Sequence, residues 1–407
     1  MKVYKWSKKI LVITHAGGSP YHGPNMRWYH LANALQDQAI KVDIVSATFF
    51  HKYFSPPKVS SRLSRETIDE IQYKWIKTSK YKSGMIRRFI NQIQFALGCY
   101  FYAKSLANFE YDYVVASSPH PLVVFPAKRI AKLSDAKFIF EIRDLWPLIL
   151  NESNGMNPWH PYAKLMAIAE SYAVKHAELI MSVKPGDFEY LNLAYKLEPN
   201  KFRYIPNGFL PGNRQDDVDK KIKKLCNDKS FIVGYVGALS SIYEIDNLIK
   251  TACRFSKEPN IAFVIAGEGP QKDELQEISK DLNNVYLIGS VPNTAVPSLL
   301  SMFDACYVGL KTMSMNRYGI SSNKIYEYMH ASKPILGCYE IGYDPVTEAE
   351  CGFVSKPGDV DALEASIRLL KDDENLAKSM GDNARLYFDK NHDFKSVRKK
   401  LILDVFI

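Results

Sequence analysis

Short apolar runs alternate with longer amphipathic segments along the whole chain of 407 residues. In the first half, the runs with the character of strands are Lys9–Thr14, Val42–Ala47, Tyr113–Ser117, Lys137–Ile142 and Leu179–Val183. In the second half they are Phe231–Gly237, Ile261–Gly267, Val285–Gly289, Ala305–Gly309 and Pro334–Cys338. Runs without polar alternation are typical of strands buried on both faces, as in a parallel sheet covered by helices. The order of the segments predicts an α/β protein with doubly wound sheets.

Ten strands are too many for one comfortable sheet, so we expect two domains. Turn-forming residues are densest between Ile205 and Asn213, and a charged stretch follows from Asp216 to Lys224. We therefore expect one domain over residues 1–207 and a second over residues 208–385. In such sheets, ligands bind at the carboxyl ends of the strands. The loops that follow the strands are therefore the candidates for function.

Composition narrows the class of protein. The chain is 46% hydrophobic and 24% charged, which is typical of soluble globular proteins. Its longest apolar candidate for a membrane span, Phe95–Ala103, is far shorter than the ~18–20 residues that a span needs. The six cysteines form no Cys-x-x-Cys pair, which argues against a zinc site or a disulfide framework. The apolar stretch Ile10–Ile13 is shorter than the ~7–15 residues of a signal-peptide core, which favours a cytosolic protein.

Positive charge is concentrated near the N-terminus. Of the net charge of +9, residues 1–110 carry 17 Lys and Arg against 6 Asp and Glu, whereas the remainder is close to neutral. Within residues 50–104, 11 basic residues face 3 acidic ones, and aromatic residues are interleaved: Tyr53, Phe54, Tyr73, Trp75, Tyr81 and Phe89. This pattern indicates an anionic partner, such as nucleic acid, anionic lipid or a phosphorylated substrate, or else a merely soluble basic face.

Residues 85–104 mix Arg87 and Arg88 with many apolar and aromatic positions, as a helix at a membrane interface would. An ordinary helix packed on the first domain has the same pattern, and the sequence leaves both interpretations open.

Three strand ends in the first half carry polar groups. The loop after the first strand, residues 15–27, is rich in Gly and Pro and precedes a helix, so it is either a ligand loop or a structural loop. It is not a G-x-G-x-x-G motif, which weakens a dinucleotide oxidoreductase interpretation. Ser117–His120 ends the third strand and Glu141–Pro147 the fourth. A core histidine or a structural ion pair would explain each of these alone, but their convergence favours a site.

The sharpest pattern lies in the second half, at residues 318–329. Ser321 or Ser322 is a natural helix N-cap, so a helix is expected to begin there. Its first turn would offer backbone N–H groups and Lys324 to a diphosphate. Glu327 falls on the same helical face as Lys324, in a position to accept hydrogen bonds from ribose hydroxyls. An ordinary surface Lys–Glu pair would produce the same spacing.

Taken together, these motifs resemble the retaining family-4 glycosyltransferases. The resemblance rests on the Gly-rich first loop, on Ile205-Pro206-Asn207-Gly208, Val236-Gly237 and Gly267-Glu268-Gly269-Pro270, and on the Ser-Ser-Asn-Lys-Ile-Tyr-Glu-Tyr-Met helix. The Glu-Ile-Arg-Asp-Leu-Trp-Pro segment at residues 141–147 is similar to the O-antigen and capsule branch, which includes N-acetyl-L-fucosamine transferases. The resemblance implies the GT-B fold, in which two Rossmann-like domains with doubly wound parallel sheets face each other across a cleft. It also implies a C-terminal helix over residues 386–407 that packs back on the N-terminal, acceptor-binding domain.

The loops and the resemblance together imply roles for individual residues. The expected donor-binding residues come from the Gly-rich strand ends and from the helix: Gly17, Gly18, Gly237, Ser240, Gly267, Glu268, Ser321, Ser322, Asn323, Lys324 and Glu327. Lys324, Asp144 and His120 are expected to be catalytic. The residues expected on the acceptor side are His22, Asn25 and Arg143.

The chain departs from the family pattern at three places. Glu327 matches the second glutamate of the Glu-x7-Glu motif, but the first would fall at Gly319. The basic pair that often follows Val-Gly is missing, because Ala238 to Glu244 contains neither Arg nor Lys. Donor phosphate binding would then depend on Lys324, the amides of residues 321–323 and Arg317. Many members have His-Asp where this chain has Arg143-Asp144, so no single catalytic base is assigned.

The resemblance implies sugar transfer from a UDP-sugar, with retention at the anomeric carbon and without a metal or other cofactor. The sugar would be an N-acetylated or deoxy hexose, and the acceptor a polyprenyl-diphosphate-linked glycan used for O-antigen or capsule. The enzyme would be cytoplasmic and peripheral on the anionic inner face of the membrane, with the basic region 50–104 toward the lipid. Nucleic acid then becomes an unlikely partner. A nucleotide-sugar 2-epimerase of the same fold and a non-catalytic nucleotide-sugar-binding protein remain alternatives.

Overall fold

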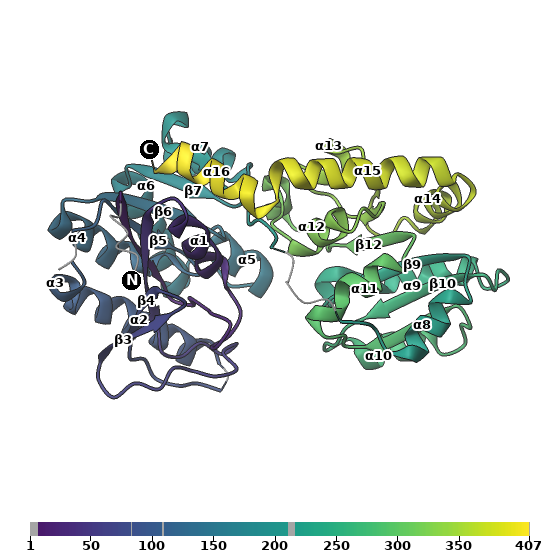
Figure 1. Ribbon diagram of the computed structural model, residues 1–407, viewed down its shortest axis with the longest axis horizontal. Helices are drawn as coiled ribbons and strands as arrows, with labels where there is room; N and C mark the ends of the chain where they lie inside the picture. The colour runs from purple at the N-terminus through teal and green to yellow at the C-terminus, as the bar shows by residue number, and fades with distance from the viewer. Residues whose placement is uncertain (1–6, 83, 108–109, 211–215, 407) are drawn as a thin grey trace. The chain divides into compact units, whose positions relative to one another are not determined.

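The computed structural model describes residues 7–82, 84–107, 110–210 and 216–406 (Figure 1). The chain forms two compact units. The first comprises Met1–Asn207 together with Val397–Ile407, and the second comprises Gly208–Ser396. Residues 211–213 of the turn-rich linker lie outside the described residues.

The first unit is built on an eight-stranded sheet with the order β3-β4-β2-β1-β5-β6-β7-β8. All neighbouring strands are parallel except β3 and β4. The strands are β1 (Lys8–Thr14), β2 (Ile40–Ala47), β3 (Leu63–Ile68), β4 (Ile71–Ile76), β5 (Tyr113–Ser117), β6 (Lys137–Ile142), β7 (Leu179–Ser182) and β8 (Phe202–Tyr204). The helices are α1 (Arg27–Gln36), α2 (Met85–Phe101), α3 (Ala103–Leu106), α4 (Val124–Ser134), α5 (Leu148–Asn154), α6 (Pro161–His176) and α7 (Asp187–Tyr195), with two 3-10 turns, η1 (Pro121–Val123) and η2 (Pro199–Lys201).

All five strands predicted in the first half are present, but β3, β4 and β8 were not foreseen. β3 and β4 form a hairpin whose turn residues Asp69 and Glu70 both have positive φ, at 48° and 68°. Charged residues interrupt both strands, and this masks the apolar pattern that marks a buried strand. β8 has only three residues, which is too short for a periodic signal.

The hairpin corrects the interpretation of the aromatic residues in region 50–104. Four of the six aromatic residues interleaved in this predicted membrane-facing region are buried in the first unit: Tyr53, Tyr73, Trp75 and Tyr81. Phe54 is exposed and Phe89 is half-buried. β4 pairs directly with β2, and five of its six residues are buried, including Tyr73 and Trp75.

The second unit contains a six-stranded parallel sheet with the order β11-β10-β9-β12-β13-β14. Its strands are β9 (Phe231–Val236), β10 (Ile261–Ala266), β11 (Val285–Gly289), β12 (Ala305–Gly309), β13 (Ile335–Cys338) and β14 (Gly352–Ser355). Its helices are α8 (Lys220–Asn227), α9 (Ile245–Arg254), α10 (Lys272–Ser279), α11 (Val296–Ser301), α12 (Asn323–His330), α13 (Pro345–Glu348), α14 (Val360–Asp372) and α15 (Glu374–Asn391), with 3-10 turns η3 (Ser241–Tyr243), η4 (Asn293–Ala295) and η5 (Ser314–Tyr318). The five strands predicted in this half are confirmed, and β14 was missed.

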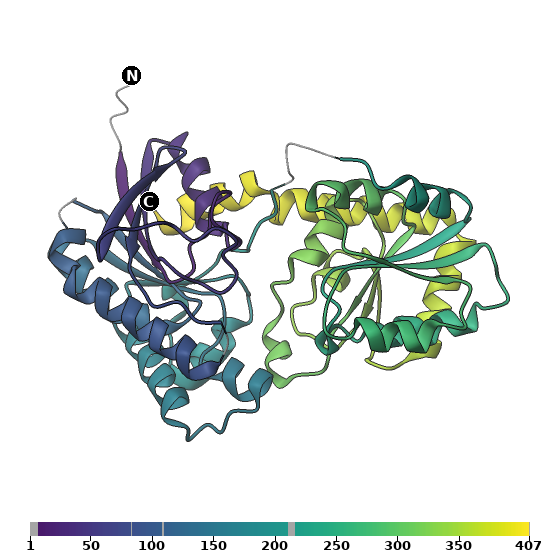
Figure 2. The same ribbon diagram turned by 90° about the horizontal axis from the view of Figure 1, so that it is seen from below.

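Helices cover both faces of this sheet (Figure 2). Apolar side chains of α8, α11, α12 and α15 join one buried cluster with one face of the strands. Those of α9, α10 and α14 join a second cluster on the opposite face. Because both faces are covered, the strands consist of uninterrupted apolar runs, which is why the sequence revealed them.

The C-terminal segment differs from its predicted bounds. α15 is continuous through residue 386 and packs against α12 of the second unit, so residues 386–396 belong to that unit. Only the part of α16 (Phe394–Val405) from Val397 onward belongs to the first unit. There Phe406 packs its ring on Tyr113 of β5, with a centroid distance of 5.1 Å. The predicted start at residue 386 lies eleven residues before Val397, where the chain joins the first unit, because a periodic helix gives no signal where its packing partner changes.

Within the described part of the chain, no helix has the length and apolar character needed to cross a membrane. The six cysteines are free, and five of them are buried as small apolar side chains.

Candidate active site

The strand order of the second sheet reverses between β9 and β12. In an open parallel sheet, the loops at such a reversal diverge to opposite faces, and the carboxyl ends of the two strands border the ligand site. The loop after β9 begins at Gly237, and α12 follows β12 through η5. The predicted donor residues of the second unit therefore come from loops at the carboxyl ends of the strands on which such sheets bind ligands.

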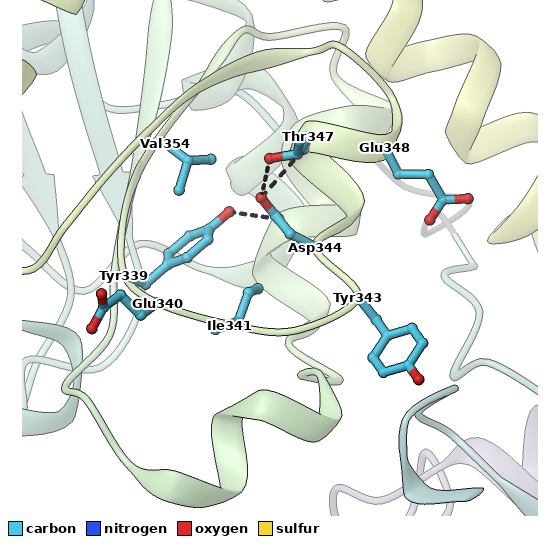
Figure 3. Close-up of a pocket in the computed structure, with 8 residues that line it drawn as sticks. All are labelled: Tyr339, Glu340, Ile341, Tyr343, Asp344, Thr347, Glu348 and Val354. Carbon is cyan, nitrogen blue, oxygen red and sulfur yellow. Dashed lines mark hydrogen bonds between the residues drawn. The ribbon is translucent and has the colours of Figure 1, made fainter. Parts of the chain in front are cut away.

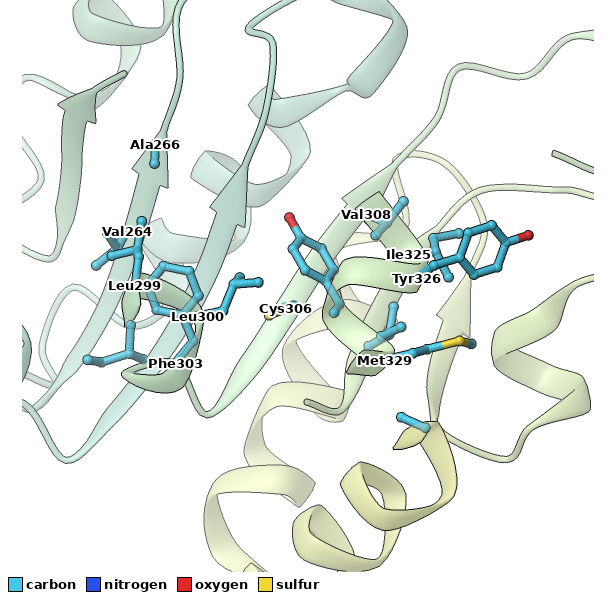
Figure 4. Packing of buried hydrophobic residues seen from close by; sticks show 14 of the residues in the cluster. Val264, Ala266, Leu299, Leu300, Phe303, Cys306, Val308, Ile325, Tyr326 and Met329 are labelled. Carbon is cyan, nitrogen blue, oxygen red and sulfur yellow. The ribbon is translucent and has the colours of Figure 1, made fainter. Parts of the chain in front are cut away.

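The packing of α12 decides which of its side chains face this site. Ile325, Tyr326 and Met329 are buried in the core beneath the helix (Figure 4). Tyr328 is buried in the same cluster. The Tyr328 hydroxyl also accepts a hydrogen bond of 2.9 Å from the Val236 N–H at the end of β9. These contacts fix the rotation of α12 about its axis.

Lys324 is the central side chain of the site. Its Nζ atom is buried and has no hydrogen-bond partner among the described residues. It lies 3.9 Å from the ring centroid of Tyr235 and 3.9 Å from that of Tyr243. A Cβ atom on Gly237 would come within 2.7 Å of this ammonium, so Gly237 provides the space that the lysine occupies.

Burial controls the ionisation of Lys324 and Glu327. It lowers the pKa of Lys324 to about 7, and the Glu327 carboxylate opposes only part of that shift. Burial likewise raises the pKa of Glu327, and Lys324 opposes that change in turn. The two groups therefore interact, as their predicted position on one helical face required. A lysine with three N–H donors and no acceptor is well suited to bind an incoming anion.

The backbone N–H groups of the predicted donor glycines in this unit are engaged within the fold, and these residues matter mainly because they lack a side chain. The Gly237 N–H donates to the Ala266 carbonyl, and the Gly267 N–H donates to the Gly289 carbonyl. A Cβ atom on Gly267 would lie 1.8 Å from the Gly237 carbonyl oxygen. Gly267 is therefore required for the close contact between the loops after β9 and β10.

The remaining predicted residues of this unit border the same region in different ways. Ser321 and Ser322 are half-buried and precede α12, and Ser322 is the N-cap but makes no side-chain capping bond. Asn323 is exposed, and Ser240 is half-buried at the start of η3. Glu268 is exposed and forms an ion pair of 2.8 Å with Lys272.

The backbone conformation of Gly319 accounts for the missing first glutamate of the Glu-x7-Glu motif. Its φ is 91°, a backbone conformation that side chains rarely adopt, so a glutamate there would be strained. The neighbouring Arg317 places its guanidinium over the Tyr318 ring, 4.6 Å from the centroid.

The first sheet has its own reversal, between β1 and β5. His15 follows β1 and His120 follows β5, and their rings meet edge to face at 4.9 Å. His15 Nε2 lies 2.6 Å from Asn91 Oδ1 of α2. His120 is fully buried, and neither of its ring nitrogens has a hydrogen-bond partner among the described residues. Burial, reinforced by His15, holds the pKa of His120 well below its usual value, so the ring is neutral.

The loop after β1 is a packed structure of its own. The Gly17 N–H donates to Ser46 Oγ, and the Gly18 N–H donates to the Asn25 carbonyl. A Cβ atom on Gly18 would lie 1.9 Å from the Pro24 carbonyl oxygen, so the loop folds tightly on itself. His22 is buried, with Nε2 3.1 Å from Glu66 and Nδ1 2.9 Å from the Ser55 carbonyl.

These contacts show what the predicted residues of this loop do in the fold. The amides of Gly17 and Gly18 are engaged, and so are both nitrogens of His22. Asn25 is half-buried with a φ of 72°. Their assignment to donor or acceptor stays a prediction.

A buried carboxylate that was quoted in the sequence motif but given no role organises the end of β6. Glu141 accepts hydrogen bonds from Arg27 at 2.9 Å, Trp28 at 2.7 Å and Ser117 at 2.5 Å. Burial would raise the pKa of Glu141, but the guanidiniums of Arg27 and Arg143 outweigh it and lower the pKa. The predicted Arg143 and Asp144 follow immediately and are half-buried at the same strand end.

Figure 3 shows a pocket of about 610 Å³ beside β13 and α13. No predicted site residue lines it. Its Asp344 caps α13 through the N–H groups of Val346 and Thr347 and accepts from the Tyr339 hydroxyl at 3.0 Å. This carboxylate is satisfied within the fold, so the pocket does not replace the site around Lys324. The described residues also include no cluster of three His, Cys, Asp or Glu that could hold a metal ion.

Residues 216–387 match the family model of glycosyl transferases group 1. This match lies within the second unit and agrees with the family resemblance that the sequence motifs indicate. Two curated relatives match in part: the uncharacterized glycosyltransferase MJ1059 of Methanocaldococcus jannaschii, with 29% identity over 140 residues, and the capsular polysaccharide biosynthesis glycosyltransferase CapM of Staphylococcus aureus, with 26% over 172. These matches cover 32% and 41% of this chain, and they span 34% and 43% of the respective relatives.

The fold extends the similarity over nearly the whole chain. The crystal structure of Anabaena Alr3699/HepE in complex with UDP matches 98% of this chain and 99% of its own, with a TM-score of 0.69 and 15% identity. This match confirms the predicted GT-B fold class.

Proposed function

We propose that this protein is a retaining glycosyltransferase that transfers an N-acetylated or deoxy hexose from a UDP-sugar to a lipid-linked glycan of a surface polysaccharide. The observation that carries the proposal is the Lys324 ammonium, which is buried without a hydrogen-bond acceptor among the described residues. It lies at the strand-order reversal of the unit that matches the group 1 glycosyl transferase model. A buried cation without a partner is costly unless a ligand supplies the missing anion. The donor diphosphate is such an anion.

Lys324 and Glu327 divide the recognition of the donor. The Lys324 ammonium binds diphosphate oxygens and stabilises the negative charge that develops on them as the sugar leaves. The Glu327 carboxylate, one helical turn further along, accepts hydrogen bonds from the ribose hydroxyls. The similar fold of HepE, which has been solved in complexes with UDP and with UDP-glucose, supports uridine as the base.

In the proposed reaction, the bond between the anomeric carbon and the diphosphate oxygen breaks. A bond to the acceptor oxygen forms on the same face of the sugar, which gives retention. The acceptor proton passes to the leaving diphosphate, so no protein base and no metal ion is required. The protein contributes positioning and stabilisation of charge.

A screen of nucleotide sugars tests the donor class. We expect UDP and a UDP-N-acetyl-deoxyhexose to raise the melting temperature, GDP-sugars to leave it unchanged, and Lys324→Met to lose the shift. Stabilisation by GDP-sugars alone would overturn the donor assignment. A new UDP-sugar formed without any acceptor would instead identify an epimerase. Tight UDP-sugar binding without turnover on lipid-linked acceptors would identify a non-catalytic binding protein.

The proposed membrane contact rests on α2. Four of its apolar side chains lie on one exposed stripe, with exposed fractions of 75% for Ile86, 45% for Ile90, 48% for Leu97 and 77% for Phe101. Their spacing of four, seven and four residues follows one helical face. The opposite face is buried through Asn91, Gln92, Phe95 and Cys99. Exposed Arg87, Arg88 and Lys104 accompany the stripe, which matches the apolar and basic character of helices that lie in an anionic lipid interface.

Sedimentation with vesicles tests this contact. We expect the protein to pellet at low salt with vesicles containing phosphatidylglycerol, but not with pure phosphatidylcholine. The double variant Ile86→Ser/Phe101→Ser should lose this binding, whereas Leu386→Ser, which removes an equally exposed leucine from α15, should keep it. Equal pelleting of both variants, or none by the wild type, would contradict the proposed contact.

A further inference from the structure

We propose that Tyr243 is a positioning residue that, together with Tyr235, holds the Lys324 ammonium ready for the donor diphosphate. Residues 238–244 of this chain contain no Arg or Lys, so binding of the diphosphate depends more strongly on Lys324 and on the two tyrosines that orient it. This inference rests on the proposed function, because it assumes that Lys324 binds the donor.

The geometry around the ammonium is that of two simultaneous cation–π contacts. Lys324 Nζ lies 3.9 Å from each ring centroid, well inside the ~6 Å within which a ring attracts a cation. The two rings are inclined by 56°, with their centroids 6.4 Å apart. Ring faces attract the charge without accepting directed hydrogen bonds, so the N–H groups stay available for phosphate oxygens.

Both rings are held in place by the surrounding fold. Tyr235 is buried in β9, and its hydroxyl donates to the Ala238 carbonyl at 2.7 Å. Tyr243 ends η3, where its N–H donates to the Ser240 carbonyl at 2.9 Å. Next to it, the Glu244 carbonyl accepts a hydrogen bond of 2.9 Å from the Tyr307 hydroxyl. The Tyr243 ring also packs against the apolar clusters on both faces of the sheet.

The charged state of Lys324 depends on few neighbours. Burial favours the neutral amine, whereas Glu327 on the same helix favours the ammonium. Tyr235 from β9 and Tyr243 from η3 bring ring faces and no charge. The Glu244 carboxylate accepts from Asn247 at 3.2 Å and so is directed toward α9. Removing one ring face therefore removes a direct stabiliser of the ammonium and lowers the pKa of Lys324 further.

Removal of the Tyr243 ring face should therefore weaken UDP binding by an amount that depends on pH. Near pH 6, Lys324 is mostly protonated with the Tyr243 ring and about half protonated without it, so the ring changes UDP binding by no more than about twofold. At about pH 9, a lower pKa leaves less ammonium to bind the diphosphate, so the loss is large. A pKa lowered by about one unit corresponds to about tenfold weaker binding at the higher pH.

The experiment compares Tyr243→Leu with Tyr243→Phe, which keeps the ring face and serves as the conservative reference. UDP dissociation constants are measured by calorimetry from about pH 6 to pH 9, where the ratio of the two variants cancels the titration of UDP itself. We expect this Leu-to-Phe ratio to rise from about two or less near pH 6 to about ten near pH 9. In the Lys324→Met background, the ratio should stay near one at every pH, because the ring then has no cation to hold. Tyr243→Met, which introduces an unbranched apolar side chain without a ring, is measured in parallel in case Tyr243→Leu does not fold.

A ratio that is the same at every pH, or that persists in the Lys324→Met background, would overturn the role of Tyr243 while leaving the proposed function intact. Failure of the wild-type protein to bind UDP at any pH would count against the proposed function itself.

Discussion

Arg27 in the first unit and Lys324 in the second are both buried cations at the carboxyl edge of a parallel sheet. Arg27 is satisfied by the protein: its guanidinium donates to Glu141 at 2.9 Å and to the carbonyls of Ile205 and Pro206 at 3.1 Å and 2.6 Å. Lys324 has two ring faces but no hydrogen-bond acceptor among the described residues.

The difference teaches how to separate a structural charge from a binding one. The acceptors of Arg27 tie the start of α1 to β6 and to the end of the first unit, so its role is complete within the fold. The N–H groups of Lys324 remain available for a ligand, and burying this ammonium lowers the free energy of unfolding. Substitutions at the two positions should therefore have opposite effects on stability and on activity.

The largest expected effect on stability is that of Arg27→Met. It leaves the Glu141 carboxylate buried without its direct ion-pair partner, which costs about 3–5 kcal/mol. All five tryptophans precede residue 160, so tryptophan fluorescence during urea unfolding reports on the first unit alone. Lys324→Met is the control and should leave this transition in place. An unchanged midpoint in Arg27→Met would show that Glu141 is solvated or re-paired.

The largest expected effect on catalysis is that of Lys324→Met. Loss of the cation that stabilises the leaving diphosphate should lower kcat by about 10²–10³-fold. The folded protein should be as stable as the wild type or more so, because an apolar side chain replaces a buried charge. Steady-state kinetics and calorimetric melting measure the two effects. A stability loss as large as that of Arg27→Met would place Lys324 among the structural cations.

The buried Lys324 should also make the stability of the protein depend on pH, which distinguishes it further from Arg27. The pKa of Lys324 is about 7 in the folded chain, against an ordinary value of 10.5. Between these values the unfolded chain binds the extra proton, so stability rises with pH through this window, by up to about 1.4 kcal/mol per pH unit from this group. The stability advantage of Lys324→Met over wild type should be largest below about pH 7 and shrink toward pH 10. Chemical unfolding followed by circular dichroism across this range measures it, and a constant difference would contradict the lowered pKa.

The smallest of these effects is expected for Glu327→Ala. Loss of the ribose contacts should weaken nucleotide binding by about tenfold, with a smaller change in kcat than Lys324→Met produces. Calorimetry with UDP and steady-state kinetics separate the two quantities. Equal losses of kcat in both variants, with unchanged nucleotide affinity, would contradict the division of roles between Lys324 and Glu327.

Local patterns were enough for part of the site. The N-cap serines and the three-residue spacing of Lys324 and Glu327 placed both side chains on one helical face, because helix geometry is local. Tyr243 escaped notice because it is far from Lys324 in sequence and nothing in its own neighbourhood marks it. A structural loop around Gly17 and Gly18 was one of the two interpretations of the sequence, but its contacts with Tyr53 and Tyr73 were not predicted, because they come from distant segments.

The sequence by itself determined the ten apolar parallel strands of the two sheets, the position of the main strand-end loops and the candidate lysine and glutamate. Apolar runs and helical spacing are properties of short segments. Only the tertiary structure decided that the aromatic side chains of β4 are buried, where α16 joins the first unit, and which cation is satisfied. Those outcomes depend on contacts between segments that are distant along the chain. Arg27 and Lys324 are both basic residues in the sequence, but they differ in the partners that folding brings to them.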